Sequence, residues 1–397
     1  MRGTEPSSAQ SDTVDRQARL SRRELLAATG TAAVGGLAGC SSGPIGGPDE
    51  VTFATLTIPA VAEVLIADER GYFADRDIEL SVERIQSAPK ATPQLANGTY
   101  DVATGSIGAS VFNAVAQDVG IRVVADQTQY WPGQPSSNRI WIREGAREGA
   151  EDIYDLPDGL TVGLHGTGNV DSYVIARILQ LNDMTWADVA TSEVYYSNMP
   201  VTMAEGEIDL VAIPDPLGLQ IPRRAEATQL GYASMVAPRM QIGAYLFGEP
   251  FAEERPDVAR RWLEGYLEGV REYYELGGFQ SETVAGIVSE AFGLPADVIR
   301  RSIPSLPHKN GSLNRESIAS QQTYHHCRGT VEETVAVDAV VDESFLEGAL
   351  EEVGRLDQDT ARPDVSTIEA WGEQAPSPYP PVGPQRVPEQ FPGADRC

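Results

Sequence analysis

The chain has 397 residues, and its 58 acidic and 30 basic residues give it a formal net charge of −28 at pH 7. This length is enough for two medium-sized domains with hydrophobic cores of their own. A surface this acidic repels nucleic acid and the anionic head groups of lipids, so we expect neither as a partner.

The acidic residues are spread along the chain rather than gathered in one block. An acidic interaction tail would place them in a block. Adaptation to high salt explains an even spread better, because dissolved ions screen the self-repulsion of such a surface. We therefore favour a halophilic source.

The first 39 residues have the pattern of an export signal. Arg22 and Arg23 precede a run of small and apolar residues that is too short to span a bilayer. The arginine pair resembles a twin-arginine export signal, and the Leu-Ala-Gly-Cys sequence ending at Cys40 resembles a lipoprotein box. We expect lipid on Cys40, a tether over residues 40–50, and a mature protein held at the outer face of the cytoplasmic membrane by this anchor alone. The alternative is a buried N-terminal helix with an incidental arginine pair.

The other two cysteines, Cys327 and Cys397, fit no metal-ligand, redox or disulfide spacing. We expect neither to have a role. His325 and His326 stand directly before Cys327, but three neighbours in sequence point in different directions. A chance cluster on a helix surface is therefore a better interpretation than a metal site.

Strands and helices alternate after the tether. Gly98 is placed to end a helix in the left-handed conformation, and Gly105 to make a sharp turn after a short buried strand. The resulting strand–helix order predicts a mostly parallel sheet. The expected strands of this region are residues 51–56, 78–83, 102–104 and 121–125, and the expected helices include residues 61–70.

The pattern Ala-x-Gly-x-x-Asp followed by an aliphatic residue occurs twice. It ends at Val102 and again at Leu210, and in both places it leads into a strand. Two lobes built alike, each with a loop at the end of a strand, would enclose a cleft.

The second half repeats the alternation. A buried strand at residues 160–165 leads into a turn and a helix at residues 170–181, which Thr167 or Asn169 could cap. The unpaired N–H groups of such a helix start suit a polar or anionic ligand. Further helices are expected at residues 256–274, 281–300 and 331–352, the first with an apolar stripe of Val258, Trp262, Tyr266 and Val270 that should face the core.

Several motifs resemble one family. The run Leu65–Ala74 is similar to the "A-x-x-x-G-Y-F" signature, and Leu95–Asp101 to the "A-L-x-x-G-x-x-D" run, of substrate-binding proteins of the nitrate, sulfonate, taurine and thiamine-precursor (NMT1/THI5-like) group. Asp155–Leu160 resembles the start of their second lobe, and the resemblance extends over roughly residues 50–350.

The resemblance implies an α/β, two-lobe type II periplasmic binding protein fold, in which each lobe is a mostly parallel sheet flanked by helices. It also implies a solute receptor, monomeric, that serves the permease subunits of an ABC-type importer. The expected regions are a signal peptide (1–39), a tether (40–50), lobe I (51–150), lobe II (151–240), the helical return to lobe I (241–360) and a proline-rich tail (361–397).

Ligands of open α/β sheets bind beyond the carboxyl ends of the strands. Together with the resemblance, this rule predicts ten ligand-binding residues. They are Thr57, Ile58, Gly105, Ser106, Tyr130, Gly166, Thr167, Gly168, Tyr195 and Asp215. The ligand classes that the resemblance implies are nitrate, sulfonates such as taurine, and heteroaromatic precursors.

Aromatic and basic residues near these strand ends leave alternatives open. Tyr130, Trp131, Tyr195 and Tyr196 could stack on a flat ligand or could wall the hinge. Arg122, Arg139 and Arg143 could bind an anion, but pairing with the many carboxylates is the plainer interpretation.

The chain offers no recognised catalytic motif. It has no Gly-x-Ser-x-Gly elbow, no phosphate-binding loop and no His-Glu-x-x-His pattern. We therefore expect a protein that is not an enzyme and has no cofactor or metal. The alternative is an enzyme of the same fold, of the thiamine-pyrimidine or menaquinone biosynthesis type.

Overall fold

The computed structural model describes residues 47–86, 90–132 and 134–363. The expected signal peptide, the lipid site at Cys40 and nearly all of the tail lie outside the described residues. No helix in the described part of the chain is both long and apolar enough to be a membrane span.

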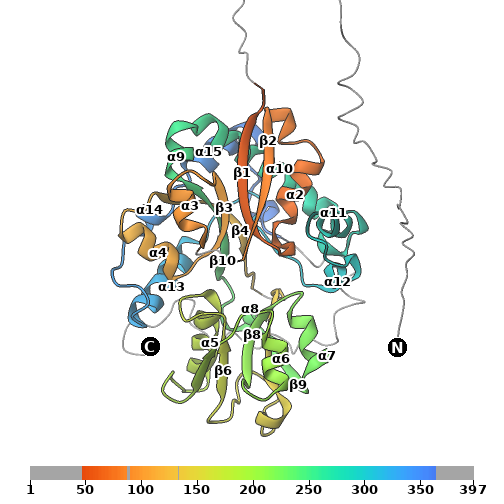
Figure 1. The fold of residues 1–397 in the computed structure, drawn as a ribbon, viewed down its shortest axis with the longest axis vertical. Coiled ribbons are helices and arrows are strands. Elements are labelled where there is room, and N and C mark those ends of the chain that lie inside the picture. Colours follow the sequence, from red (N-terminus) through yellow and green to blue (C-terminus); the bar gives the residue numbers. More distant parts are fainter. Residues whose placement is uncertain (1–46, 87–89, 133, 364–397) are drawn as a thin grey trace, which may run out of the picture. The chain divides into compact units, whose positions relative to one another are not determined.

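Strands and helices alternate as far as residue 248, and the named elements of the described chain after it are all helices (Figure 1). The strands are β1 (Asp49–Leu56), β2 (Ile78–Ile85), β3 (Val102–Ser106), β4 (Ile121–Gln129), β5 (Asn138–Arg143), β6 (Thr161–Leu164), β7 (Ala190–Glu193), β8 (Leu210–Pro214), β9 (Ala227–Tyr232) and β10 (Gln241–Gly248). The α-helices are α2 (Ala62–Glu69), α3 (Thr92–Ala96), α4 (Ala109–Ala116), α5 (Val170–Leu181), α6 (Met199–Ala204), α7 (Ile221–Arg224), α8 (Ala233–Val236), α9 (Glu249–Glu254), α10 (Pro256–Glu275), α11 (Glu282–Phe292), α12 (Ala296–Arg301), α13 (Arg315–Cys327), α14 (Val337–Val340), α15 (Ser344–Val353) and α16 (Gln358–Ala361).

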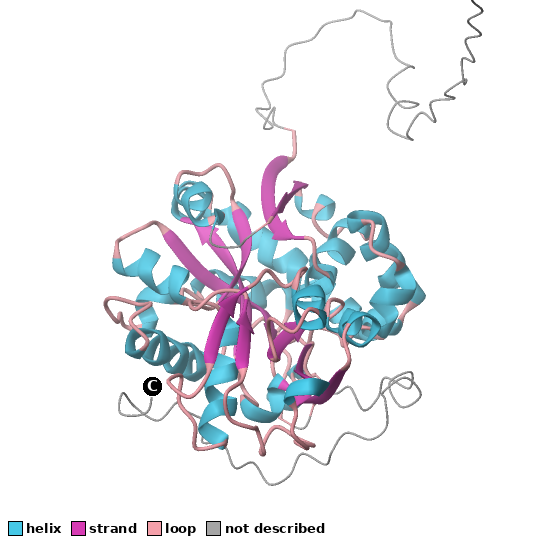
Figure 2. Ribbon diagram, turned by 60° about the horizontal axis from the view of Figure 1, so that its bottom comes forward, coloured by secondary structure: helices cyan, strands magenta, loops and turns pink. Residues whose placement is uncertain are grey.

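The described strands form two five-stranded sheets of the same topology. Lobe I has the order β2-β1-β3-β10-β4, and lobe II the order β7-β6-β8-β5-β9. In each sheet one strand, β10 or β5, is antiparallel to both of its neighbours, whereas the other pairings are parallel. The predicted fold class, with two mostly parallel sheets flanked by helices, is confirmed (Figure 2).

The antiparallel strand in each lobe is the one by which the chain enters from the other lobe. The chain leaves lobe I after β4 and enters lobe II with β5, then returns from β9 through α8 to β10. The first crossing therefore lies at residues 130–137, before the expected boundary at residue 150. The segment 138–143 is a strand of lobe II because it pairs with β8 and β9.

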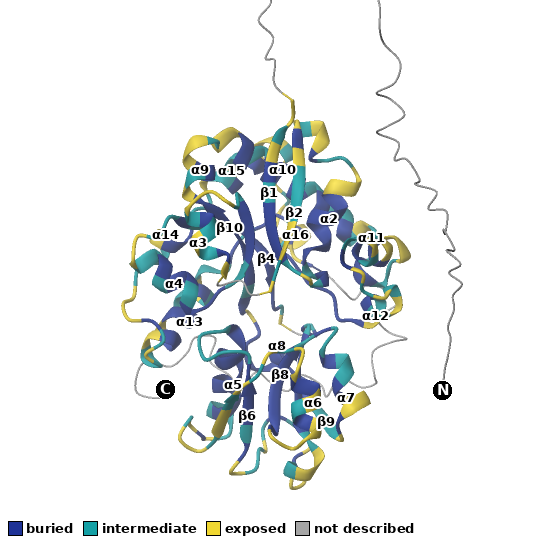
Figure 3. Cartoon of the chain, viewed as in Figure 1, coloured by how far each residue is buried: buried dark blue, intermediate teal, exposed yellow. Residues whose placement is uncertain are grey.

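The inner strands of each sheet are buried beneath helices, whereas the edge strands β2 and β7 are largely half-buried or exposed (Figure 3). In lobe I, α10 packs against α2 and α15, and its expected apolar stripe is buried, with Trp262 fully inaccessible. Trp262 lies beside Phe73, Tyr245 and Tyr266, with ring centroids 5.2–6.0 Å away. The prediction that this stripe belongs to the core is confirmed.

Two local predictions were wrong. Gly105 does not make a turn, because β3 continues through Ser106 by pairing with β10 as far as Gly243. His325 lies on the helix α13, but its side chain is fully buried rather than on the helix surface. By contrast, Gly98 ends its helix with a φ of 74° as predicted.

Cys327, at the end of α13, is disulfide-bonded. The expectation that Cys327 takes part in no disulfide is therefore wrong. Both other cysteines of the sequence, Cys40 and Cys397, lie outside the described residues. Within those residues, no group of three or more histidine, cysteine, aspartate or glutamate side chains could hold a metal ion.

Candidate functional site

A cavity of about 1130 Å³ lies where the carboxyl ends of the parallel strands of both lobes meet. Lobe I contributes the residues that follow β1 and the ends of β3 and β4. Lobe II contributes the residues that follow β6, β7 and β8, together with part of α7. This is the position at which open α/β sheets bind ligands, because loops converge there while the strands hold them in place.

Six of the ten predicted ligand-binding residues line this cavity. They are Thr57, Ile58, Gly105, Ser106, Tyr195 and Asp215. They come from four different strand ends and from both lobes. As contacts to a ligand they stay predictions.

The other four predicted residues lie elsewhere. Tyr130 is buried beside the core of lobe II, and its N–H donates to the carbonyl of Met240 at 2.8 Å, across the two crossing segments. It therefore walls the hinge, one of the two expected alternatives. Gly166, Thr167 and Gly168 do not line the cavity.

The loop of these last three residues contacts the other lobe instead. The N–H of Ala109, the first residue of α4, donates to the carbonyl of Gly168 at 2.9 Å. A Cβ atom on Gly108 would lie 2.5 Å from that carbonyl oxygen. The absence of a side chain at Gly108 thus allows the two lobes to approach.

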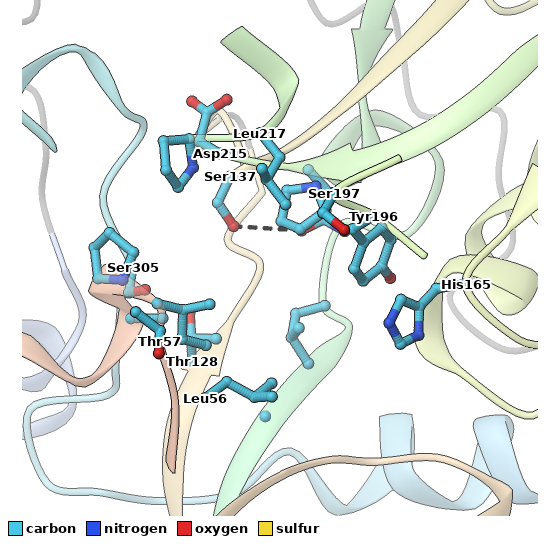
Figure 4. A pocket seen from close by; sticks show the side chains of 18 of the residues that line it. Leu56, Thr57, Thr128, Ser137, His165, Tyr196, Ser197, Asp215, Leu217 and Ser305 are labelled. Atoms are coloured by element: carbon cyan, nitrogen blue, oxygen red, sulfur yellow. Dashed lines mark hydrogen bonds between the residues drawn. The ribbon is translucent and has the colours of Figure 1, made fainter. Parts of the chain in front are cut away.

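A ring pair forms one wall of the cavity (Figure 4). His165, which directly follows β6, stacks on Tyr196 with ring centroids 4.3 Å apart and an angle of 26° between the planes. Tyr195 meets the same histidine edge-on at 5.7 Å. Of these rings, His165 was missed from the sequence, although its place directly after a buried strand could have indicated it.

His165 is held by two residues at the start of α5, Asn169 at its N-cap and Asp171 in its first turn. Its Nδ1 lies 3.1 Å from the side-chain nitrogen of Asn169, and its backbone N–H donates to Oδ2 of Asp171 at 2.6 Å. Burial lowers the pKa of His165 below its ordinary value, so the ring is neutral at pH 7 and can both donate and accept hydrogen bonds. Asn169 stands at the N-cap of α5 but makes no capping hydrogen bond with its side chain.

The carboxylate of Asp215 is occupied by the protein. Nε of Arg139 donates to Oδ1 at 2.7 Å and Nη2 donates to Oδ2 at 2.8 Å, and the N–H of Ile303 donates to Oδ2 at 2.9 Å. Both side chains of the ion pair are at most 5% exposed. In Figure 4 this carboxylate points away from Thr57 and Thr128.

The three arginines considered as anion ligands are all paired with carboxylates. Arg122 pairs with Asp342 and Glu253, Arg139 with Asp215, and Arg143 with Asp209. The plainer interpretation is confirmed, except that the Arg139 pair is buried rather than on the surface.

Most residues of the remaining interior wall are apolar, among them Leu56, Leu217 and Ile242. Thr57, Thr104, Thr128, Ser137 and Ser305 supply hydroxyl groups. Three of them are already engaged in part: Oγ1 of Thr104 donates to Oγ1 of Thr55 at 3.1 Å, Oγ1 of Thr128 accepts the N–H of Leu306 at 3.3 Å, and Oγ of Ser137 donates to Oδ1 of Asn138 at 3.4 Å. Among the described lining residues, the interior therefore offers hydrogen bonds and ring stacking, but no unpaired buried charge.

A family model described as "NMT1/THI5 like" matches residues 58–275, more than half of the chain. The chain belongs to the NMT1/THI5-like family. The matched region includes most of the cavity lining and both crossings between the lobes. The family recognised from the short motifs is confirmed.

Solved structures share the fold of this NMT1/THI5-like protein. The periplasmic nitrate-binding protein NrtA from Synechocystis PCC 6803 has a TM-score of 0.64 at 14% identity, over 80% of this chain and 91% of that one. The ligand-binding component of an ABC-type import system from Staphylococcus aureus, with zinc bound, has a TM-score of 0.62 at 14% identity, over 76% of this chain and 99% of that one. The periplasmic aliphatic sulphonate-binding protein SsuA from Escherichia coli has a TM-score of 0.59 at 17% identity, over 74% of this chain and 92% of that one. A comparison with curated proteins gives no match.

Proposed function

We propose that the protein is an extracytoplasmic solute-binding protein that encloses a small molecule between its lobes and delivers it to an ABC-type importer. The observation that carries this proposal is the cavity of about 1130 Å³ lined by strand ends of both lobes. A ligand that touches both lobes favours their closed arrangement, because it binds that arrangement more tightly than the open one. The nitrate- and sulphonate-binding proteins that share the fold support the same role.

Ligand binding can be tested by thermal shift in molar KCl with nitrate, taurine, alkanesulfonates and pyrimidines as probes. A bound solute raises the melting temperature, since it binds the folded state alone. Thr57→Trp, which places a bulky ring at the wall of the cavity where lobe I lines it, should abolish the shift. Thr283→Trp, on the exposed face of α11, is the matched control and should keep it.

Failure of every probe to raise the melting temperature, together with no co-purified solute in denatured samples, would contradict the proposal. Chemical conversion of a probe by the wild-type protein would favour the enzyme of the same fold instead.

We further propose that Cys40 carries lipid and that the protein is exported by the twin-arginine route. The sequence before Cys40 supports both statements. In the source cell, Cys40→Ala should release the protein from the membrane fraction, whereas Arg22→Lys with Arg23→Lys should retain the precursor inside. A Cys40→Ala protein that stays with the membrane would contradict the lipid anchor.

A further inference from the structure

Charge is distributed unevenly over the cavity wall. Its lining includes four cationic side chains, Lys90, Arg223, Arg224 and Arg301, and one carboxylate, Asp215. Because Arg139 neutralises that carboxylate, the wall has a positive balance. The whole chain has the opposite balance, with 58 acidic and 30 basic residues.

These cations lie at the outer end of the cavity, since all four residues are exposed to solvent. Arg223 and Arg224 are on α7 of lobe II, and Arg301 is on α12 of lobe I. The two helices lie on the same side of the molecule in Figure 1, one in each lobe.

Lys90 and the two arginines of α7 have no ion pair within the described residues, and of these only the arginines present a planar set of N–H donors to a ligand. Arg301 pairs with Asp297 on its own helix at 2.8 Å. No ion pair within the described residues involves Arg223 or Arg224. A guanidinium group presents several N–H donors in one plane and suits the oxygens of a carboxylate, sulfonate or phosphate.

The interior has a different chemistry. The guanidinium of Arg139 is paired with Asp215. The groups left to contact a ligand are the neutral His165–Tyr196 ring pair and the hydroxyl groups. An anion placed there would lose its hydration without meeting an unpaired cation, which is unfavourable.

We infer that Arg223 and Arg224 determine the specificity of the cavity by binding an anionic group at one end of the solute, while the uncharged and planar remainder of the solute lies against His165 and Tyr196. This inference rests on the proposed solute-binding function. The charged group of the solute then lies at the mouth of the cavity. A small inorganic anion is disfavoured as the solute, because it has no uncharged part to lie against the ring pair. A volume of about 1130 Å³ is also large for such an anion.

Three probes test the inference by isothermal titration calorimetry at low and at molar KCl. Benzenesulfonate carries a ring and an anionic group, benzamide a ring alone, and nitrate a charge alone. For the wild-type protein we expect benzenesulfonate to bind at least tenfold more tightly than either of the other two. Its affinity should fall as KCl rises, because the contact at the mouth is exposed to screening.

The variant R223Q/R224Q removes two positive charges at the mouth. We expect it to lose at least tenfold in affinity for benzenesulfonate and to keep its affinity for benzamide within twofold. The variant R300Q/R355Q removes the same charge away from the cavity lining and should change neither affinity. This control separates a local contact from the general field of the protein.

Three outcomes would overturn the inference: equal wild-type affinities for benzenesulfonate and benzamide, nitrate binding as tightly as benzenesulfonate, or equal effects of the two double variants. In each of these cases a probe binds, so the solute-binding function stands. Absence of binding by all three probes also overturns the inference, and the wider thermal-shift panel then decides separately on the proposed function.

Discussion

The two lobes share one topology but use corresponding acidic residues differently. The repeated Ala-x-Gly-x-x-Asp run shows what they have in common. Asp101 of lobe I accepts the N–H of Thr52 on β1 at 2.9 Å, and Asp209 of lobe II accepts the N–H of Thr161 on β6 at 2.9 Å. The glycines of the run, Gly98 and Gly206, have φ values of 74° and 78°. The run therefore anchors a neighbouring strand in each lobe.

The helices that follow β1 and β6, which occupy the same place in the two sheets, show the difference. The first turn of each carries a fully buried acid: Glu63 on α2 and Asp171 on α5. Glu63 accepts a hydrogen bond from the hydroxyl of Tyr245 at 2.7 Å inside the core. Asp171 instead accepts the N–H of His165, which lines the cavity. Lobe I buries its acid for packing, whereas lobe II uses its acid to position the site.

The largest expected effect concerns Glu63. Burial raises its pKa from 4.5 to about 8, so the folded state binds more protons than the unfolded state between these values, and stability falls as pH rises from 4.5 to 8. Glu63→Gln cannot ionise and should therefore be more stable than the wild type at pH 9, by on the order of 4 kcal/mol. Near pH 4 the two proteins should be alike. Urea unfolding at both pH values measures this.

The exposed Glu69 on the same helix supplies the control. Glu69→Gln should leave the pH dependence unchanged. Burial also raises the pKa of Asp126 to about 7, so some pH dependence should remain in Glu63→Gln. If Glu63→Gln gained no stability over the wild type between pH 4 and pH 9, Glu63 would not be the group responsible.

The second prediction compares the repeated aspartates. Asp209→Ala removes the acceptor of the Thr161 N–H and the partner of Arg143, whose Nε lies 2.9 Å away. We expect a loss of about 3 kcal/mol in the free energy of unfolding. Asp101→Ala should cost less, about 2 kcal/mol, because Nη1 of Arg255 lies 3.3 Å from Asp101 and the same arginine keeps its hydrogen bond to the carbonyl of Glu50.

Glu347→Ala is the control for both aspartate variants, because its ion pair with Arg355 is exposed and such pairs contribute little. Chemical unfolding of the three variants measures the order of their losses in the free energy of unfolding. Equal losses in all three would show that the repeated run does not anchor the strands.

The sequence was sufficient for features that depend on local chemistry. The repeated run, the left-handed Gly98 and the apolar stripe of α10 follow from spacing and residue type. It was not sufficient where distant segments decide the outcome. Gly105 belongs to a strand because β10, which comes after the whole of lobe II in the sequence, pairs with it. Asp215 is paired with Arg139, and so is not free to bind a ligand, because the pairing of β5 with β8 brings these two residues together.

The third prediction concerns the contact between the lobes. Gly108→Ala places a Cβ atom 2.5 Å from the carbonyl oxygen of Gly168, so the lobes cannot approach as closely. We expect a tenfold loss in affinity for a bound solute, with benzenesulfonate as the probe, and little change in stability. Gly286→Ala has open space around it and should bind as the wild type does. An unchanged affinity in Gly108→Ala would show that this contact does not accompany closure.

The smallest effect is expected for Asp171, and it sharpens the difference between the two buried acids. Asp171→Asn weakens the acceptor of the His165 N–H and loosens the loop that holds the ring pair. Burial raises the pKa of Asp171 to about 7, so the comparison is made at pH 8.5, where the carboxylate is charged. There we expect a loss of about threefold in benzenesulfonate affinity, since a neutral acceptor makes a weaker hydrogen bond than a charged one. Glu63→Gln should bind as the wild type does, because Glu63 does not line the cavity. If both variants lost affinity equally, the buried acids would affect the site through general stability rather than through the position of His165.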